Sequence, residues 1–186
     1  MAKGKEAKKE IIITGFGGQG IVLAGHILGQ AVALVDHRQS TLVQSYGPEA
    51  RGGATMASVI ISEEPIRYPK VVHPHILVCL TQEAYNKFSG IIWPGGLLLT
   101  DSHYIKQEPK VDARQVELEM YRTVMDKIGK PIVFNICMLG AVMAMVDLIS
   151  PEAIMKVLEN RIPADFLDLN RQALELGLRL GGEYKF

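Results

Sequence analysis

Cysteine is scarce in this chain of 186 residues, and its scarcity excludes two kinds of metal centre. Only Cys79 and Cys137 are present, whereas an iron–sulfur cluster takes about four cysteine ligands. A structural zinc site needs clustered cysteines or histidines at short spacing, which are also missing. Any redox centre must therefore belong to a cofactor or to another chain. Both cysteines lie in apolar runs, so we favour buried free thiols over a disulfide.

The chain also lacks a surplus of either charge and any long apolar run. Twenty basic residues balance twenty acidic ones, so there is no broad attraction to nucleic acid or to an anionic membrane. No run approaches the roughly 18 apolar residues that span a bilayer. The lysine-rich residues 1–9 lack the apolar core of a signal peptide. We expect a basic N-terminal tail over 1–9 and a cytoplasmic protein that binds neither nucleic acid nor membrane.

Recognisable catalytic groups are missing as well. The Gly-x-Ser-x-Gly turn of a serine nucleophile is absent, and no pair of catalytic carboxylates can be identified from spacing. His73 and His75 share an extended segment without a nearby carboxylate or cysteine to complete a metal site. We therefore predict no catalytic residue and no metal ligand in this chain.

Short apolar runs alternate with segments of helical periodicity. The pattern predicts strands over 10–14, 54–62, 76–80, 97–100 and 131–135. It predicts helices over 18–34, 82–88, 114–128, 136–148 and 163–180, and a further helix that starts at Ser150-Pro151-Glu152. Residues 36–53 are expected to be a connection with at most a short extended piece at 41–43. The alternation indicates a single three-layer α/β/α domain over 10–186, with a mostly parallel central sheet.

The first glycine-rich segment, residues 15–20, follows a strand and precedes a helix. This is the context of the Gly-x-Gly-x-x-Gly fingerprint, in which backbone amides and a helix N-terminus face a phosphate. Three interpretations stay open: binding of free NAD(P), close helix–strand packing without a ligand, and contact with a phosphate-bearing cofactor held partly by another subunit. Asp36 lies near the position of a ribose-binding acid, but residues 33–35 belong to the end of the helix. The candidate cofactor-binding residues are Gly15, Gly17, Gly18, Gln19 and Gly20.

The second glycine-rich segment covers residues 45–53 and carries one acid and one arginine. Proline and glycine frame these charges, and arginine offers a planar donor fork suited to carboxylate or phosphate. A plain surface turn is the alternative. We favour an interface or site-completing loop, with Tyr46, Glu49, Arg51, Gly52 and Gly53 as its candidate residues.

Together the two segments resemble the γ subunit of 2-oxoacid:ferredoxin oxidoreductases. Residues 65–69, the run 77–88 with Gln82-Glu83-Ala84-Tyr85, and Asn135 with Leu139-Gly140-Ala141 fit the same resemblance. It extends over residues 10–177, and ordered motifs over such a length are far more specific than the glycine fingerprint.

The resemblance implies a multi-subunit enzyme that decarboxylates a 2-oxoacid on thiamine diphosphate, passes electrons through iron–sulfur clusters to ferredoxin, and forms an acyl-CoA. In this family the thiamine and cluster motifs lie on α, β and possibly δ subunits or domains. We therefore expect a non-redox subunit, inactive alone, that binds no cofactor by itself and helps to close a site around thiamine diphosphate or coenzyme A. The resemblance favours 2-oxoglutarate, with pyruvate or branched-chain oxoacids next. The alternatives are a self-contained NAD(P)-binding dehydrogenase and a pure assembly scaffold.

Overall fold

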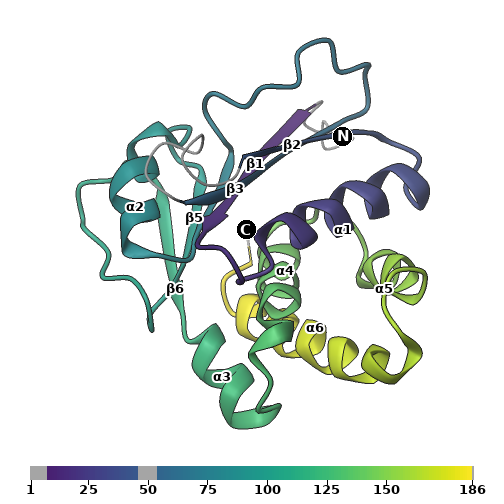
Figure 1. Cartoon of the computed structure of the whole chain (residues 1–186). Helices are drawn as coiled ribbons and strands as arrows, with labels where there is room; N and C mark the ends of the chain where they lie inside the picture. The colour runs from purple at the N-terminus through teal and green to yellow at the C-terminus, as the bar shows by residue number, and fades with distance from the viewer. Residues whose placement is uncertain (1–7, 46–53, 186) are drawn as a thin grey trace.

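The computed structural model describes residues 8–45 and 54–185, which form a twisted six-stranded sheet packed between helices (Figure 1). The strand order across the sheet is β2-β3-β1-β4-β5-β6. The strands are β1 (Lys8–Gly15), β2 (Gln39–Ser45), β3 (Thr55–Ser62), β4 (Ile76–Cys79), β5 (Leu97–Asp101) and β6 (Arg114–Leu118). The α-helices are α1 (Ile21–Leu34), α2 (Gln82–Phe88), α3 (Met120–Lys127), α4 (Phe134–Met145), α5 (Pro151–Glu159) and α6 (Leu167–Gly182).

Strand β1 divides the sheet into an antiparallel part and a parallel part. On one side it pairs antiparallel with β3, which pairs antiparallel with β2. On the other side it pairs parallel with β4, and the parallel arrangement continues through β5 to β6. Three of the five strand pairings are parallel, which confirms the predicted α/β class with a mostly parallel sheet.

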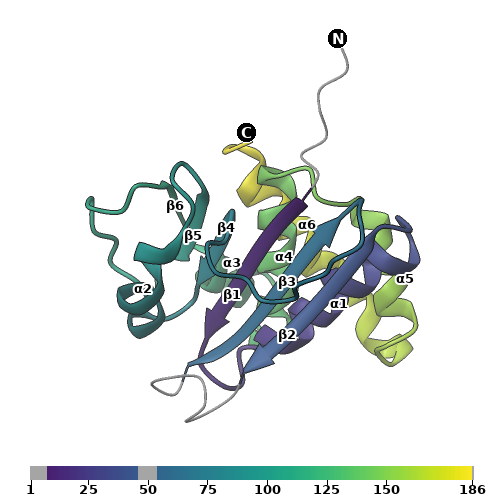
Figure 2. The ribbon, with the colours of Figure 1, turned by 90° about the horizontal axis from the view of Figure 1, so that it is seen from above.

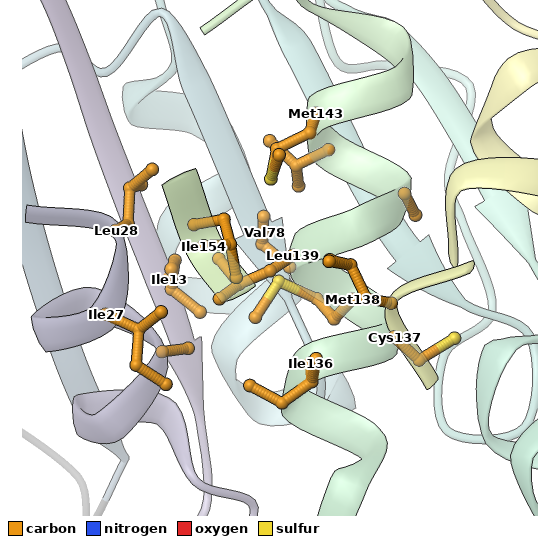
Figure 3. Packing of buried hydrophobic residues seen from close by; sticks show 14 of the residues in the cluster. Ile13, Ile27, Leu28, Val78, Ile136, Cys137, Met138, Leu139, Met143 and Ile154 are labelled. Atoms are coloured by element: carbon orange, nitrogen blue, oxygen red, sulfur yellow. The ribbon is translucent and has the colours of Figure 1, made fainter. Parts of the chain in front are cut away.

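The larger core lies between the sheet and the helices α1, α4, α5 and α6. Figure 3 shows Leu139 of α4 beside Ile13 of β1 and Val78 of β4, with Ile27 of α1 nearby. All four side chains are at most 1 % exposed. Helix α4 has buried residues around its whole circumference because α6 covers the side that faces away from the sheet. The predicted core methionines Met138, Met143 and Met145 lie here and are buried.

The opposite face of the sheet carries a thinner layer. Helix α2 and the 3₁₀ turn η2 (Ser89–Ile91) cover it together with irregular connections. Figure 1 shows α2 on the side of the sheet away from α1 and α4. Tyr85 anchors this layer: its ring is buried, and its hydroxyl donates to Gln115 Oε1 at 2.8 Å and accepts from the Glu108 N–H at 2.7 Å.

Three predicted elements differ from the structure. The expected short piece at 41–43 is the full strand β2, because it pairs along its whole length with β3. The predicted helix over 114–128 is strand β6 followed by α3. Val116 and Leu118 are buried while Glu117 between them is exposed, which is the period of two of a strand. The predicted strand over 131–135 is a 3₁₀ turn, η3 (Pro131–Val133), that leads into α4. A short apolar run cannot by itself be assigned to strand or buried helix.

Two local predictions are confirmed. The Ser150 hydroxyl accepts a hydrogen bond from the Ala153 N–H and so caps α5, with Pro151 at the first helical position. Cys79 and Cys137 are free and buried. Burial raises the pKa of the Cys79 thiol, and burial together with the nearby Asp101 carboxylate raises the pKa of Cys137 to about 12. Neither thiol is an available nucleophile at neutral pH.

Close packing of α6 against α4 depends on glycine and gives a first prediction. A Cβ at Gly177 would overlap the carbonyl oxygen of Cys137, which belongs to α4 and cannot move without shifting the helix. We expect Gly177→Ala to lower the free energy of unfolding by about 1–3 kcal/mol, measured by denaturant titration. The control is Gly182→Ala at the end of the same helix, where a Cβ meets nothing within 4 Å. Equal stability of the two variants would contradict this account.

Candidate functional site

The first glycine-rich segment lies where the chain leaves two neighbouring parallel strands in opposite directions. After β1 the chain enters α1 on one face of the sheet, and after β4 it enters α2 on the other face (Figure 1). Such a topological switch point leaves a crevice at the carboxyl ends of the strands, which is where open α/β sheets bind ligands. Residues 15–20 lie at this switch point, between the end of β1 and the start of α1.

The side chain of Gln19 spans the switch point. Its Oε1 accepts from the Phe16 N–H at 2.9 Å, and its Nε2 donates to the Leu80 carbonyl at 3.2 Å. Only 8 % of Gln19 is exposed. A Cβ at Gly15 would overlap Gln19 Oε1 and lie 3.2 Å from Leu80 Cβ, so glycine is required where β1 ends. Gln19 therefore fixes the shape of the loop from within.

Gly20 and Asn135 form the second fixed point of the loop. Gly20 precedes α1 with a φ of 73°, and a Cβ there would lie 2.5 Å from Asn135 Nδ2. Asn135 Nδ2 donates to the Gly20 carbonyl at 3.3 Å. No side chain caps the N-terminus of α1, so amide groups of its first turn have no partner within the helix. Gly18, with a φ of 97°, has nothing within 4 Å of the position of a Cβ.

Two buried oxygens beside the loop have no hydrogen-bond partner among the described residues. Thr14 Oγ1 lies directly before the loop, and Asn135 Oδ1 belongs to the side chain that holds Gly20. Thr14 and Asn135 are 0 % and 2 % exposed. Buried polar atoms are usually satisfied, so this end of the sheet retains unused hydrogen-bonding capacity.

An aromatic cluster borders the loop on the side of β5. The Phe16 ring, which is 46 % exposed, meets Tyr104 edge-on with centroids 6.3 Å apart. Tyr104 contacts Tyr121 at 5.2 Å, and His103 stacks on Tyr121 at 4.7 Å with an interplanar angle of 19°. Phe134, at the start of α4, closes the base of the cluster.

Buried Asp101 positions this cluster from the end of β5. Its Oδ1 accepts from the His103 N–H at 2.9 Å and its Oδ2 from the Tyr121 N–H at 2.7 Å. Burial raises the pKa of the Asp101 carboxyl, and these backbone N–H groups oppose that rise. Burial, with the nearby Tyr121 and Asp101, raises the pKa of Tyr104 to about 12. Tyr104 therefore keeps its hydroxyl proton at neutral pH.

The second glycine-rich segment begins and ends beside the first. Ser45 at the end of β2 pairs with Met56, and Thr55 at the start of β3 pairs with Gly15. Tyr46, Glu49, Arg51, Gly52 and Gly53 themselves lie outside the described residues. Their contact with a cofactor or a neighbouring chain, like that of Gly15, Gly17, Gly18, Gln19 and Gly20, stays a prediction.

The histidine pair has contacts within the fold. His75 Nδ1 accepts from the Glu10 N–H at 3.1 Å, and its ring stacks on Trp93 at 5.9 Å. His73 meets the same Trp93 side chain edge-on, with ring centroids 6.2 Å apart. Over residues 8–45 and 54–185, no group of three His, Cys, Asp or Glu side chains could hold a metal ion.

The connection after α1 differs from that of a dinucleotide-binding fold. In that fold the second strand lies parallel beside the first, and an acid at its end binds the ribose. Here the next strand, β2, lies at the sheet edge, antiparallel to β3. Asp36 lies in the turn after α1, where it pairs with Arg38. The topology therefore does not favour the NAD(P) interpretation.

Sequence reasoning missed Asp101, His103, Tyr104 and Tyr121. The available signal was Asp101, the acid directly after the predicted strand 97–100, because the carboxyl end of a parallel strand is a common site position. Tyr121 carried no such signal, since its segment was predicted as the middle of a longer helix.

Comparison with known proteins shows the family. A model of the pyruvate ferredoxin/flavodoxin oxidoreductase family matches residues 10–180. This match covers most of the chain, and the chain belongs to that family.

Full-length relatives have the same size. A 2-oxoglutarate synthase subunit KorC from Methanocaldococcus jannaschii is 43 % identical over 178 residues, which cover 95 % of this chain and 95 % of the relative. A pyruvate synthase subunit PorC from Methanothermobacter marburgensis is 32 % identical over 171 residues, with 90 % and 94 % coverage. These relatives are subunits of oxidoreductases, so other subunits are the partners expected of a family member.

Solved structures agree with this placement. The γ subunit of a keto/oxoacid ferredoxin oxidoreductase from Geobacter sulfurreducens has a TM-score of 0.87 and 37 % identity, and covers 96 % of this chain and 99 % of its own. The 2-oxoglutarate:ferredoxin oxidoreductase from Magnetococcus marinus has a TM-score of 0.85 at 20 % identity, which shows the fold. It covers 96 % of this chain, and the match takes up 32 % of that longer chain.

The pKa of Asp101 gives a second prediction. Burial raises the pKa of Asp101 in the folded state. The protonated carboxyl therefore contributes to the free energy of unfolding. This contribution is fully present below the unfolded-state pKa of about 3.9 and is lost as pH rises through the folded-state pKa. Asp101→Asn removes the titration. We expect the free energy of unfolding of the unaltered chain, minus that of the variant, to be largest below about pH 4 and to shrink as pH rises toward neutral. Asp126→Asn on the exposed side of α3 is the control, and a difference that grows with pH would contradict the account.

Proposed function

We propose that this chain is the γ subunit of a 2-oxoglutarate:ferredoxin oxidoreductase. The observation that carries the proposal is the 43 % identity to a 2-oxoglutarate synthase subunit along 95 % of both chains. Two relatives named as pyruvate synthase subunits are less similar, at 32 % and 29 % identity. Pyruvate or a branched-chain oxoacid is the second choice.

The proposed role is to complete a site that companion subunits hold. In the assembled complex, thiamine diphosphate would supply decarboxylation and iron–sulfur clusters would carry the electrons. Coenzyme A would accept the acyl group. The loop 15–20 suits a phosphate-bearing group, since the N-terminus of α1 has no side-chain cap and Gly18 leaves open space. Gln19 and Asn135 would hold the loop in shape, while Phe16 presents an exposed ring at its tip.

The proposed partners are the α and β subunits, with a δ subunit where one exists, and ferredoxin through them. Among the described residues, no helix is long and apolar enough to cross a bilayer. We place the complex in the cytoplasm.

Substrate choice gives a third prediction. The complex purified with its native companions should reduce viologen with 2-oxoglutarate and coenzyme A at a kcat/KM at least about tenfold above that with pyruvate, a difference of about 1.4 kcal/mol in transition-state binding. A preference for pyruvate would overturn the substrate assignment. Turnover by this chain without companions would overturn the subunit role.

Arg51 gives a fourth prediction, which separates a site-completing role from a scaffold. We expect the complex with Arg51→Ala to assemble fully but to show a raised KM for coenzyme A or a lowered kcat, because a charge-assisted hydrogen bond is lost. Arg122→Ala is the control, since that arginine lies 69 % exposed on α3. Loss of assembly with Arg51→Ala would instead favour the pure scaffold.

A further inference from the structure

Helix α1 and strand β2 together form a surface without fixed charge. Neither Ile21–Leu34 nor Gln39–Ser45 contains an aspartate, glutamate, lysine or arginine. Two apolar side chains of these elements are nevertheless exposed: Leu34 by 65 % beside the hollow between α1 and β2, and Val43 by 43 % on the face of β2 that points away from α1. On its other side Leu34 borders Lys156 of α5 and Arg161 just after that helix. Solvent-facing helices normally carry charged residues on their outer side. We call this surface, Ile21–Leu34 with Gln39–Ser45, the α1/β2 surface.

Strand β2 is one of the two sheet edges, and its outer side pairs with no strand in residues 8–45 and 54–185 (Figure 2). Natural proteins usually protect such an edge with charge, proline or a covering segment. The opposite edge, β6, shows this protection: it carries Arg114 and Glu117, and Arg114 Nη2 donates to the carbonyl of Tyr184 near the C-terminus. Strand β2 has neither charge nor proline.

A shallow hollow of about 250 Å³ runs between α1 and β2, next to the open edge. Its lining is uncharged apart from the one titratable side chain, His26. Leu42 extends from β2 toward α1, and exposed Leu34 borders the hollow from the helix. If a further strand paired with β2, its side chains on the α1 face of the sheet could pack in this largely apolar hollow.

The sequence of β2 indicates what pairs with it. Gln39-Ser40-Thr41-Leu42-Val43-Gln44-Ser45 is nearly symmetric in character about Leu42. If two copies of β2 pair antiparallel about Leu42, each Leu42 lies opposite the Leu42 of the other copy. Thr41 then lies opposite Val43, and the polar residues 39–40 lie opposite the polar residues 44–45. β-branched pairs across strands are favourable, and no like charges meet.

We propose that the α1/β2 surface binds a second copy of this chain through antiparallel pairing of β2 with β2 about a two-fold axis at Leu42. This isologous contact joins the two sheets into one continuous sheet. Both α1 helices then lie on the same face of the joined sheet. The proposal goes beyond the proposed function, because it requires neither a cofactor nor a companion subunit.

A single introduced cysteine tests the pairing in the full chain. Leu42→Cys places two thiols directly opposite each other, with Cα atoms about 4.5–5.5 Å apart, within disulfide reach. Val43→Cys is the matched control, because each thiol introduced there faces Thr41 of the other copy and its Cα lies more than about 7 Å from the equivalent Cα. The native cysteines are buried and do not interfere. After mild oxidation we expect a disulfide-linked dimer from Leu42→Cys and little from Val43→Cys.

A charge design gives a second measurement if the cysteine variants fail to fold. In Thr41→Lys/Val43→Lys, lysine faces lysine twice across the axis, whereas Thr41→Glu/Val43→Lys forms two opposite-charge pairs at the same positions. We expect the apparent Kd of dimerisation to be at least about tenfold higher for the first variant, by sedimentation over a range of concentrations.

Three outcomes overturn the proposal: an unaltered chain that sediments as a monomer, equal cross-linking of the two cysteine variants, or equal Kd values in the charge design. The chain could instead be monomeric alone, with β2 amides that gain protection from hydrogen exchange only when companion subunits are added. That result would show that β2 pairs with a different subunit. None of these outcomes bears on substrate preference, so failure here is distinguishable from failure of the proposed function.

Discussion

The arrangement of the molecule depends on the two different neighbours of β1. Strand β1 pairs antiparallel with β3 and parallel with β4, and the chain leaves β1 into α1 on one face of the sheet but leaves β4 into α2 on the other (Figure 1). The glycine loop therefore lies at a topological switch point, and the positions beside β1 are taken by β3 and β4, so that β2 lies at the outer edge. The same topology therefore creates the candidate site and leaves β2 exposed at the sheet edge.

Buried polar groups, more than apolar packing, give the loop its shape. Gln19 links the loop to the end of β4, Asn135 links it to α4, and Asp101 holds the turn and helix that carry the aromatic cluster. Each of these side chains is buried and hydrogen-bonded to backbone, so each constrains the chain near the glycine loop. Ordering of this kind before binding reduces the entropy cost of holding a ligand or a companion chain.

Much of the fold could be predicted from local signals. The run 10–14, the glycines after it and the cap at Ser150 each specify their structure within a few residues. Strand β2 could not be found in this way, because its polar residues become a strand through pairing with β3. The predictions for residues 114–118 and 131–135 were wrong for a similar reason, because burial by distant elements decided between strand and helix. In the site, the glycines were evident, but Tyr121 reaches the cluster only through a turn that long-range contacts with Asp101 define.

The contact of Trp93 with two imidazoles, stacked with His75 and edge-on with His73, has a spectroscopic consequence. Trp93 is the only tryptophan of the chain and is 52 % exposed, at the amino ends of β4 and β5, opposite to the glycine loop. Burial, followed by the positive charge of Lys9, lowers the pKa of His75. The ring beside the indole therefore stays uncharged at neutral pH. The tryptophan emission of the protein thus reports on the end of the sheet remote from the glycine loop, and a ligand at the loop would have to be followed through the tyrosines instead.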